Sequence, residues 1–128
     1  MIGARLGRVN VRLVKEYRFE AAHLLPNVPA GHKCQRLHGH SFKVELAIEG
    51  PVDDKTGWFI DFGDLDEIWA PLYDTLDHHY LNEVPGLENP TSENLARWLW
   101  ERVIPKLPQL SRVTVYETCD ARCEYEGN

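Results

Sequence analysis

The chain has 128 residues, with 14 Lys and Arg against 20 Asp and Glu, so its formal net charge is −6 at pH 7. This length predicts one domain spanning residues 1–128, and a hydrophobic content of 43% is enough for a packed core, which excludes a disordered chain. The acidic balance argues against a nucleic-acid partner, because such a protein needs a basic face. A small anionic substrate needs only a local basic patch and is therefore not excluded.

Membrane insertion and secretion are not indicated by the sequence. No apolar run approaches the ~18 residues that a membrane helix needs. Residues 1–10 lack the apolar core of a secretory signal, and we expect them to form an N-terminal extension. Three Cys residues are too few and too unevenly spaced for a disulfide framework. We therefore expect a cytoplasmic protein with reduced cysteines and no membrane partner.

The first half of the chain has the alternation of strands. Apolar residues at every second position predict a strand over residues 9–20, extended by residues 21–23. A loop rich in Pro and Gly follows, and a second strand is expected over residues 40–49. After a polar turn, residues 58–62 are expected to form a short third strand.

The second half begins with two helical patterns. Asp64 is the expected N-cap of the first helix, which should kink or restart at Pro71. Thr91 or Ser92 is expected to cap the second helix. Alternation over residues 112–118 and a short edge strand over residues 123–125 complete the chain. Two main strands, two helices and two strands in this order predict an α+β fold with an antiparallel sheet.

Three histidines fall at strand ends that are expected to be neighbours. His38 and His40 are two positions apart, so their side chains share one side of a strand, and His23 ends the strand that should pair with it. Three imidazoles can bind Zn²⁺ and leave its fourth position open, as in catalytic zinc sites. Such pairs also arise by chance, and His23 can be a core residue. The spacing alone leaves both interpretations open.

The cysteines allow several interpretations. Cys34 lies in a loop beside His32 and Lys33, where a thiol can act as a base or nucleophile. It could also be an inert exposed thiol or a fourth zinc ligand in a closed structural site. Cys119 and Cys123 could bind a metal or form a reversible disulfide, but packing is the favoured interpretation because no further Cys pair completes a cluster.

Carboxylates accompany the remaining candidate residues. Asp77 directly precedes His78, and a carboxylate beside an imidazole can fix its tautomer if both turn toward one site. Such pairs are also common at helix ends. Glu117 lies in an alternating strand, where a carboxylate is usually solvated, although in a pocket it could bind a guanidine-like edge through both oxygens.

Several blocks in order resemble the 6-pyruvoyltetrahydropterin synthase family, over about residues 14–127. They are FEAAH (19–23), CQRLHGHS (34–41), GWFIDFGDL (57–65), LDHHYLN (76–82), NPTSENLA (89–96) and VYET (115–118). The stretch GHKCQRLHGHS and its short Cys-to-His spacing are most similar to the bacterial branch that makes 6-carboxy-5,6,7,8-tetrahydropterin for queuosine and other 7-deazaguanines.

The resemblance implies a tunnelling fold, in which a four-stranded antiparallel sheet carries two helices on one face. It implies that subunits join their sheets into a trimeric barrel and that two trimers stack. It also implies site residues. His23, His38 and His40 match the zinc ligands, Cys34 matches the catalytic cysteine, and Asp77 with His78 matches the proton relay. Glu117 matches the carboxylate that anchors the pterin, and Thr118 follows it in the same block.

The implied reaction converts 7,8-dihydroneopterin triphosphate into 6-carboxytetrahydropterin, acetaldehyde and triphosphate. Two alternatives are a triphosphate lyase that forms the pyruvoyl product and a non-catalytic zinc-binding assembly protein. The presence of Cys34, Asp77, His78 and Glu117 together argues against the non-catalytic alternative. The sequence leaves open which side chains hold the triphosphate, whether trimers pair, and the role of residues 1–10, Cys119 and Cys123.

Overall fold

The computed structural model describes residues 9–128, so most of the expected N-terminal extension over residues 1–10 lies outside the described residues. Two long strands, β1 (Asn10–His23) and β2 (His38–Pro51), form a hairpin. The strands β4 (Leu110–Thr118) and β5 (Ala121–Tyr125) form a second hairpin near the C-terminus. Between the hairpins lie α1 (Phe62–Leu76), the two-residue strand β3 (His79–Tyr80) and α2 (Ser92–Val103).

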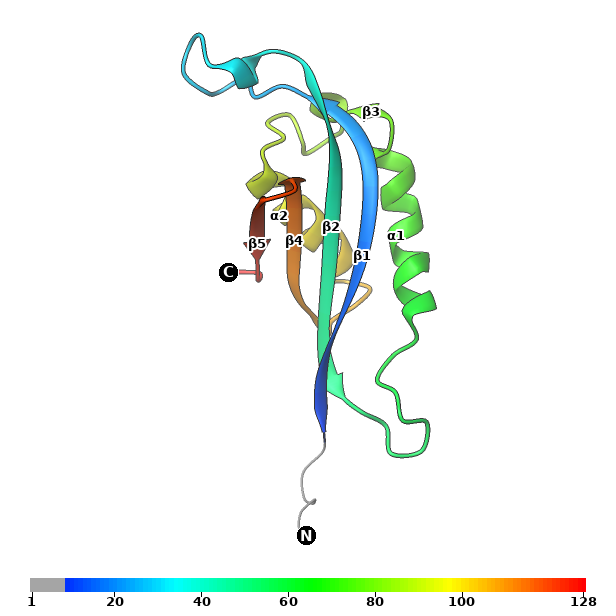
Figure 1. The fold of residues 1–128 in the computed structure, drawn as a ribbon. Helices are drawn as coiled ribbons and strands as arrows, with labels where there is room; N and C mark the ends of the chain where they lie inside the picture. Colours follow the sequence, from blue (N-terminus) through cyan, green and yellow to red (C-terminus); the bar gives the residue numbers. More distant parts are fainter. Residues whose placement is uncertain (1–8) are drawn as a thin grey trace.

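The strands form one sheet in the order β3-β1-β2-β4-β5 (Figure 1). The pairs β1–β2, β2–β4 and β4–β5 are antiparallel, which confirms the expected four-stranded antiparallel sheet. The short strand β3 was not expected, and it pairs in parallel with residues Ala21 and Ala22 of β1. This pairing holds the segment that follows α1 against the C-terminal end of β1.

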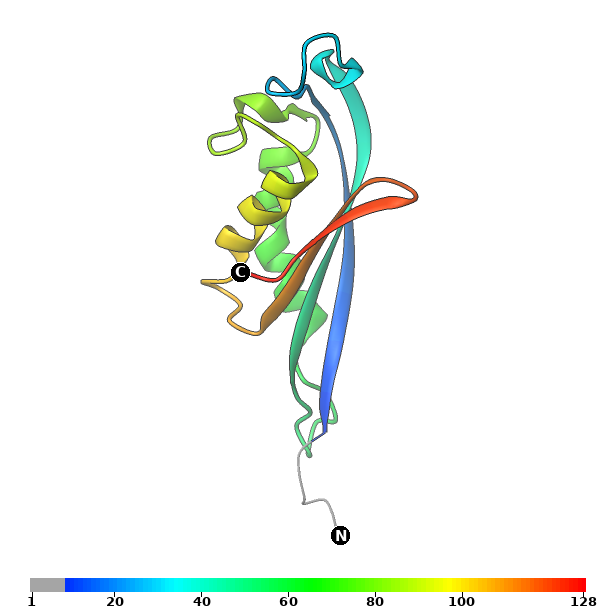
Figure 2. The ribbon, with the colours of Figure 1, turned by 90° about the vertical axis from the view of Figure 1, so that its left-hand side faces the viewer.

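Both helices cover the same face of the sheet, as Figure 2 shows. The core between the layers contains inward side chains of the strands, such as Phe19, Phe42 and Val115, and the apolar stripe of α2, including Leu95 and Leu99. Burying one large apolar side chain contributes roughly 1.5–3 kcal/mol to the stability of the fold. The apolar residues at every second position of each long strand therefore determine which face of that strand points into the core. The expected α+β class is confirmed.

The boundaries around α1 differ from the sequence expectation. Residues 58–61 form no strand, and Phe62 begins the helix. Phe59 and Ile60 instead pack against the core from a loop, so their apolar character reflects burial without strand pairing. The N-cap is Asp61, whose carboxylate accepts a hydrogen bond from the amide of Gly63, and not Asp64. The expected third strand and the expected cap were therefore wrong.

The helix α1 continues through Pro71 and does not restart there. Its last turn carries a hydrogen bond that the hydroxyl of Thr75 donates to the carbonyl of Pro71. Thr91 is the N-cap of α2, because its hydroxyl accepts a hydrogen bond from the amide of Asn94. Within residues 9–128, no helix combines the length and the hydropathy required of a membrane span.

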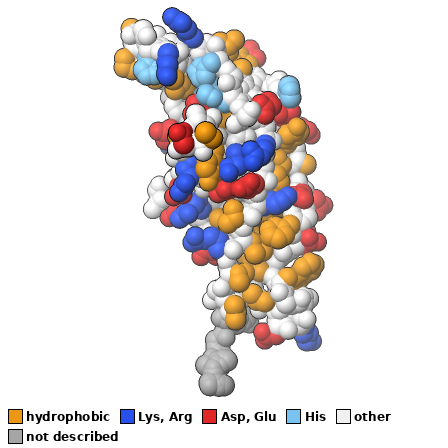
Figure 3. All heavy atoms as spheres, in the orientation of Figure 1, with side chains coloured by type: hydrophobic (Ala, Val, Ile, Leu, Met, Phe, Trp, Pro, Cys, Tyr) orange, Lys and Arg blue, Asp and Glu red, His pale blue; other side chains and the backbone are white. Residues whose placement is uncertain are grey.

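The opposite face of the sheet carries no helix, and Figure 3 shows its side chains. Acidic and basic side chains lie next to each other across its middle. Lys43 lies 3.5 Å from Glu16 and 3.8 Å from Glu45, and its ammonium group also lies over the ring of Tyr116. We call this helix-free face of the sheet the outer face, and we call the face covered by the helices the inner face. The two faces place the candidate functional residues in different environments.

Candidate metal centre

The three candidate histidines lie together at one end of the inner face. In the β1–β2 hairpin His23 is opposite His38, and His40 is opposite Ala21, so all three side chains leave the strands on the same side. Their ring centroids are 4.6 Å apart for His23 and His38, 5.1 Å for His23 and His40, and 4.9 Å for His38 and His40. The structure therefore brings together the residues that the sequence placed at neighbouring strand ends.

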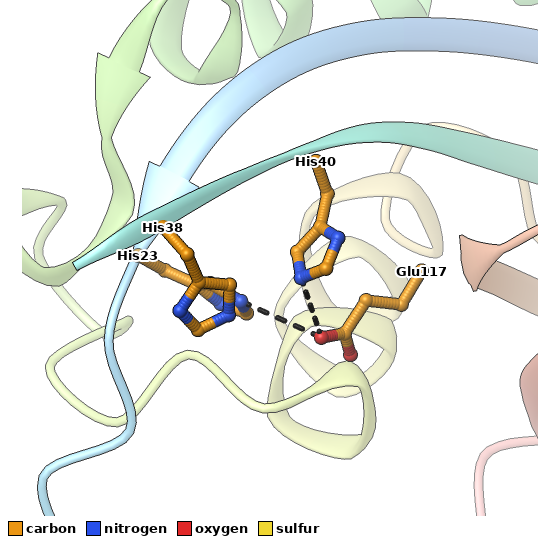
Figure 4. Close-up of side chains that lie close together, drawn as sticks. All are labelled: His23, His38, His40 and Glu117. Carbon is orange, nitrogen blue, oxygen red and sulfur yellow. Dashed lines mark ion pairs between the residues drawn. The ribbon is translucent and has the colours of Figure 1, made fainter. Parts of the chain in front are cut away.

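Glu117 of β4 joins these histidines (Figure 4). Its Oε1 lies 3.0 Å from Nε2 of His40 and 3.5 Å from Nε2 of His23. One nitrogen or oxygen atom from each of the four residues lies within 4.8 Å of those of the others. In the zinc interpretation of the sequence the fourth position is open, whereas here the carboxylate of Glu117 lies against the three histidines.

Two backbone carbonyls fix the orientation of the histidine rings. Nδ1 of His23 lies 2.9 Å from the carbonyl oxygen of Pro90, and Nδ1 of His38 lies 2.7 Å from that of Arg36. A carbonyl oxygen can only accept, so Nδ1 carries the proton in both rings. When these rings are neutral, Nε2 therefore carries no proton, and its lone pair is available to a metal ion. Metal-binding histidines commonly have this arrangement of a backbone acceptor behind the ring.

The cluster contains buried ring nitrogens that lack a hydrogen-bond partner. His23 is fully buried, and neither its Nε2 nor that of His40 has a hydrogen-bond partner. Oε1 of Glu117 lies 3.5 Å from Nε2 of His23. Unpaired buried polar atoms are costly, and a cation between these atoms would remove the cost. The donor set of imidazole nitrogens and a carboxylate oxygen fits Zn²⁺.

The electrostatics of the cluster also favour a cation. A His23 ring that carries a proton on Nε2 as well as on Nδ1 would donate a hydrogen bond to Glu117; this interaction, together with the hydrogen bond from Ser92, lowers the pKa of Glu117 to about 2 even though burial opposes this. Burial lowers the pKa of His40, and its histidine neighbours act in the same direction while Glu117 opposes them. At neutral pH the carboxylate is therefore ionised and the ring of His40 is neutral, which are the states that bind metal.

Cys34 lies in the loop that joins β1 to β2, within the short 3-10 helix Lys33–Gln35. Its amide donates to Nδ1 of His32, and its carbonyl accepts from the amide of Leu25. Among the described residues, the group that could hold a metal ion does not include its sulfur. The structure therefore gives no support to Cys34 as a fourth ligand in a closed structural site.

Asp77 and His78 form a close pair at the C-terminal end of α1. Oδ2 of Asp77 lies 2.7 Å from Nδ1 of His78, and Oδ1 accepts a hydrogen bond from the amide of Glu20. His78 has a φ of 58°, and its amide donates to the carbonyl of Glu20. A left-handed backbone in a residue other than Gly is uncommon and is enriched at functional sites.

The pKa values of this pair move in opposite directions. The hydrogen bond with Asp77 and the charge of that carboxylate raise the pKa of His78, and the charge of Glu20 adds to this. The amide of Glu20 and the His78 ring lower the pKa of Asp77. The His78 side chain is 78% exposed, so a proton held on its ring is accessible from outside.

The Asp77–His78 pair and the metal cluster do not contact each other. His78 lines a groove of about 430 Å³ with residues that include Glu20, Ala22 and Ser41. These three positions alternate with the inward residues of β1 and β2 and so belong to the outer face. His40 is the one member of the cluster that also lines this groove. Within the described part of one chain, no hydrogen bond or ion pair joins the two groups, and His40 is the residue through which the cluster reaches the groove of His78.

Ser92 is a site residue that sequence reasoning identified only as a candidate helix cap. Its hydroxyl donates a hydrogen bond of 2.6 Å to Oε2 of Glu117. The only sequence signal was its place at the start of α2. Thr118, in contrast, is exposed, and its hydroxyl donates to the carboxylate of Asp120. Cys119 is exposed, whereas Cys123 packs against the core, and all three cysteines are free.

Comparisons with known proteins agree on the family. A family model described as 6-pyruvoyl tetrahydropterin synthase matches residues 12–128. A 6-carboxy-5,6,7,8-tetrahydropterin synthase from Synechocystis is 40% identical over 119 residues, which cover 88% of this chain and 91% of the relative. A dihydroneopterin monophosphate aldolase from Pyrococcus furiosus is 32% identical and is covered over 99% of its length, with 92% of this chain. The solved structure of the 6-pyruvoyl tetrahydropterin synthase from Caenorhabditis elegans superposes with a TM-score of 0.87 and 26% identity, over 96% of this chain and 100% of that one.

Proposed function

The chain belongs to the 6-pyruvoyl tetrahydropterin synthase family, and we propose that it is a zinc-dependent 6-carboxy-5,6,7,8-tetrahydropterin synthase. In this proposal it converts 7,8-dihydroneopterin triphosphate into 6-carboxytetrahydropterin, acetaldehyde and triphosphate, as a carbon–carbon lyase of the queuosine and 7-deazaguanine pathway. The similarity to the Synechocystis enzyme of that name supports this choice within the family.

The observation that carries the proposal is the pair of buried ring nitrogens without hydrogen-bond partners in the cluster. The Nε2 atoms of His23 and His40 are buried without hydrogen bonds, and both lie near an ionised carboxylate. With His38 they would hold Zn²⁺. When bound there, zinc would supply Lewis acidity toward the oxygens of the substrate side chain. A non-catalytic zinc-binding protein would need these ligands but not the groups described next.

The proton transfers are assigned to Cys34 and to the Asp77–His78 pair. Cys34 would accept a proton from a side-chain carbon as a thiolate. Asp77 holds Nδ1 of His78 and raises the pKa of that ring, so His78 can carry a proton near neutral pH and deliver it from the exposed Nε2. These roles suit an isomerisation of the side chain in which protons move between carbon and oxygen.

Glu117 is assigned to the pterin ring system. A carboxylate with two oxygens can accept hydrogen bonds from the amino group and the neighbouring ring N–H of a pterin. Glu117 is 24% exposed and lies at the cluster, so a pterin bound to it would have its side chain near the metal ligands. Thr118 follows it at the end of β4 and is the second proposed substrate-binding residue.

Assembly is proposed to complete the site. In one chain His78 lines a groove that only His40 of the cluster also lines, and it makes no hydrogen bond to the cluster. Both edges of the sheet also have unpaired stretches, because β3 covers only two residues of β1 and β5 has one neighbour. Edges of this kind can pair with further chains. We propose a homo-oligomer, either a trimeric barrel or two stacked trimers, with pockets between subunits.

Product identification tests the proposal. The zinc-loaded protein should release acetaldehyde from 7,8-dihydroneopterin triphosphate. A pyruvoyl product without acetaldehyde would favour the alternative triphosphate lyase, which shares the fold and the metal. The similarity to an aldolase makes full product analysis necessary, because this family is not confined to one reaction. Zinc binding without turnover would favour a non-catalytic assembly protein.

A further inference from the structure

The two oxygens of Glu117 have different environments. Oε2 accepts a hydrogen bond of 2.6 Å from the hydroxyl of Ser92. Oε1 lies 3.0 Å and 3.5 Å from the Nε2 atoms of His40 and His23 (Figure 4). A carboxylate that only anchors a pterin would need both oxygens free for the ligand, whereas here one is bound and the other faces the metal-binding cluster.

The position of Ser92 explains why its hydroxyl is free to reach Glu117. Thr91 caps α2 by accepting a hydrogen bond from the amide of Asn94, so the cap does not need the Ser92 hydroxyl. Hydrogen bonds from hydroxyl groups to carboxylates are short and roughly twice as strong as those between neutral groups. This hydrogen bond fixes the rotation of the Glu117 carboxylate and directs Oε1 toward the histidines.

The same short segment also orients a histidine. The carbonyl of Pro90 accepts from Nδ1 of His23, two residues before Ser92 contacts Glu117. Residues 90–92 at the start of α2 therefore orient two of the four groups of the cluster, and both point their free atoms to the same place. Outer groups that orient metal ligands in this way usually have large effects on metal affinity.

We propose that Glu117 is the fourth metal ligand of the substrate-free protein and that Ser92 is the positioning residue that holds it there. The inference rests on the proposed function only for the identity of the metal. Three imidazoles and one carboxylate would supply all four ligands that zinc takes in proteins. The two roles of Glu117 then follow one another, because it binds the metal before the substrate arrives and the pterin afterwards.

Zinc competition with a chromophoric chelator tests both residues. In Glu117→Gln the dissociation constant for zinc should rise about 10- to 100-fold, and in Ser92→Ala about tenfold. Ser92→Thr keeps the hydroxyl and should restore the affinity of the unmodified protein. In the cobalt(II)-substituted protein, the visible absorption spectrum should change in Glu117→Gln and Ser92→Ala but not in Ser92→Thr.

The chain offers a matched control on the outer face. There the hydroxyl of Ser41 donates to the carboxylate of Glu20, also at 2.6 Å, away from the cluster. Glu20→Gln and Ser41→Ala should leave zinc affinity and the cobalt spectrum unchanged. Circular dichroism of each variant verifies that the fold is intact.

The inference is overturned if Glu117→Gln and Ser92→Ala bind zinc as tightly as the unmodified protein and their cobalt spectra are unchanged. That result together with lost turnover in Glu117→Gln would leave Glu117 as a pterin anchor only. The failure of the proposed function looks different. In that case no acetaldehyde is released by the unmodified protein, although Glu117 and Ser92 still affect zinc affinity and the cobalt spectrum.

Discussion

Replacing His38 by Ala tests the metal centre with little damage to the fold. His38 lies at the start of β2, its side chain is partly exposed, and it is absent from the hydrophobic core. Its Nδ1 contacts only the carbonyl of Arg36, next to a loop where water can replace the ring. His23 is a poorer choice because its ring is fully buried, so its removal would leave a cavity.

The size of the effect follows from the number of ligands. Structural zinc sites with four ligands bind with roughly 10–16 kcal/mol at pH 7, or about 3 kcal/mol for each ligand. Because ~1.4 kcal/mol is a factor of ten in affinity, His38→Ala should weaken zinc binding about 100-fold. The free energy of unfolding of the metal-free protein should change by less than about 1 kcal/mol, as expected for a residue outside the core.

The assay measures zinc content after dialysis and the zinc dissociation constant by chelator competition. The control is His79→Ala, because His79 is exposed, contacts the carbonyl of Asp77, and lies outside the cluster. His79→Ala should retain zinc. If His38→Ala keeps one zinc per chain with an unchanged dissociation constant, the assignment of the cluster as a metal centre is wrong.

Three further substitutions test the two proton-transfer groups and one turn of the fold. Cys34→Ala should keep its zinc and lose turnover, and a loss of zinc would make Cys34 a ligand. Asp77→Asn should lower the pKa of His78 in an NMR titration, because Asp77 raises it. Because the pKa of His78 is raised in the folded state, it contributes stability below about pH 6.5, and this stability is lost as the pH rises through the folded-state pKa. Because the pKa of Asp77 is lowered in the folded state, it contributes stability above about pH 3.9. The variant should therefore lose most stability between these pH values, and an equal loss at pH 9 would contradict the pairing. Gly86→Ala should cost about 1–3 kcal/mol in urea denaturation, because Gly86 has a φ of +91° and its added Cβ would lie 3.0 Å from Trp98. An unchanged midpoint would refute this.

Much of the fold could be predicted from the residues because burial sets the alternation of the long strands. Phe19 and Phe42 are opposite each other in the β1–β2 hairpin and stack in the core, as two-residue periodicity requires. The loop containing Phe59 was mistaken for a strand because apolar residues that pack without strand partners give the same pattern. The strand His79–Tyr80 has two residues, and its pairing depends on where α1 places it.

The cluster of His23, His38, His40 and Glu117 was partly predictable for the same reason. Side chains alternate between the two faces of a strand, so His23, His38 and His40 lie on the same face once β1 and β2 pair. Glu117 comes from β4, and its approach to the histidines depends on the register between β2 and β4, which no local pattern fixes. Ser92 was missed as a site residue because its contact with Glu117 exists only after α2 packs on the sheet.

The most direct test of the account is the product formed from 7,8-dihydroneopterin triphosphate by the zinc-loaded protein. We expect acetaldehyde in amounts equal to 6-carboxytetrahydropterin, and we expect His38→Ala to form neither. Turnover that yields a pyruvoyl pterin and no acetaldehyde, or full acetaldehyde formation by the zinc-free protein, would contradict it.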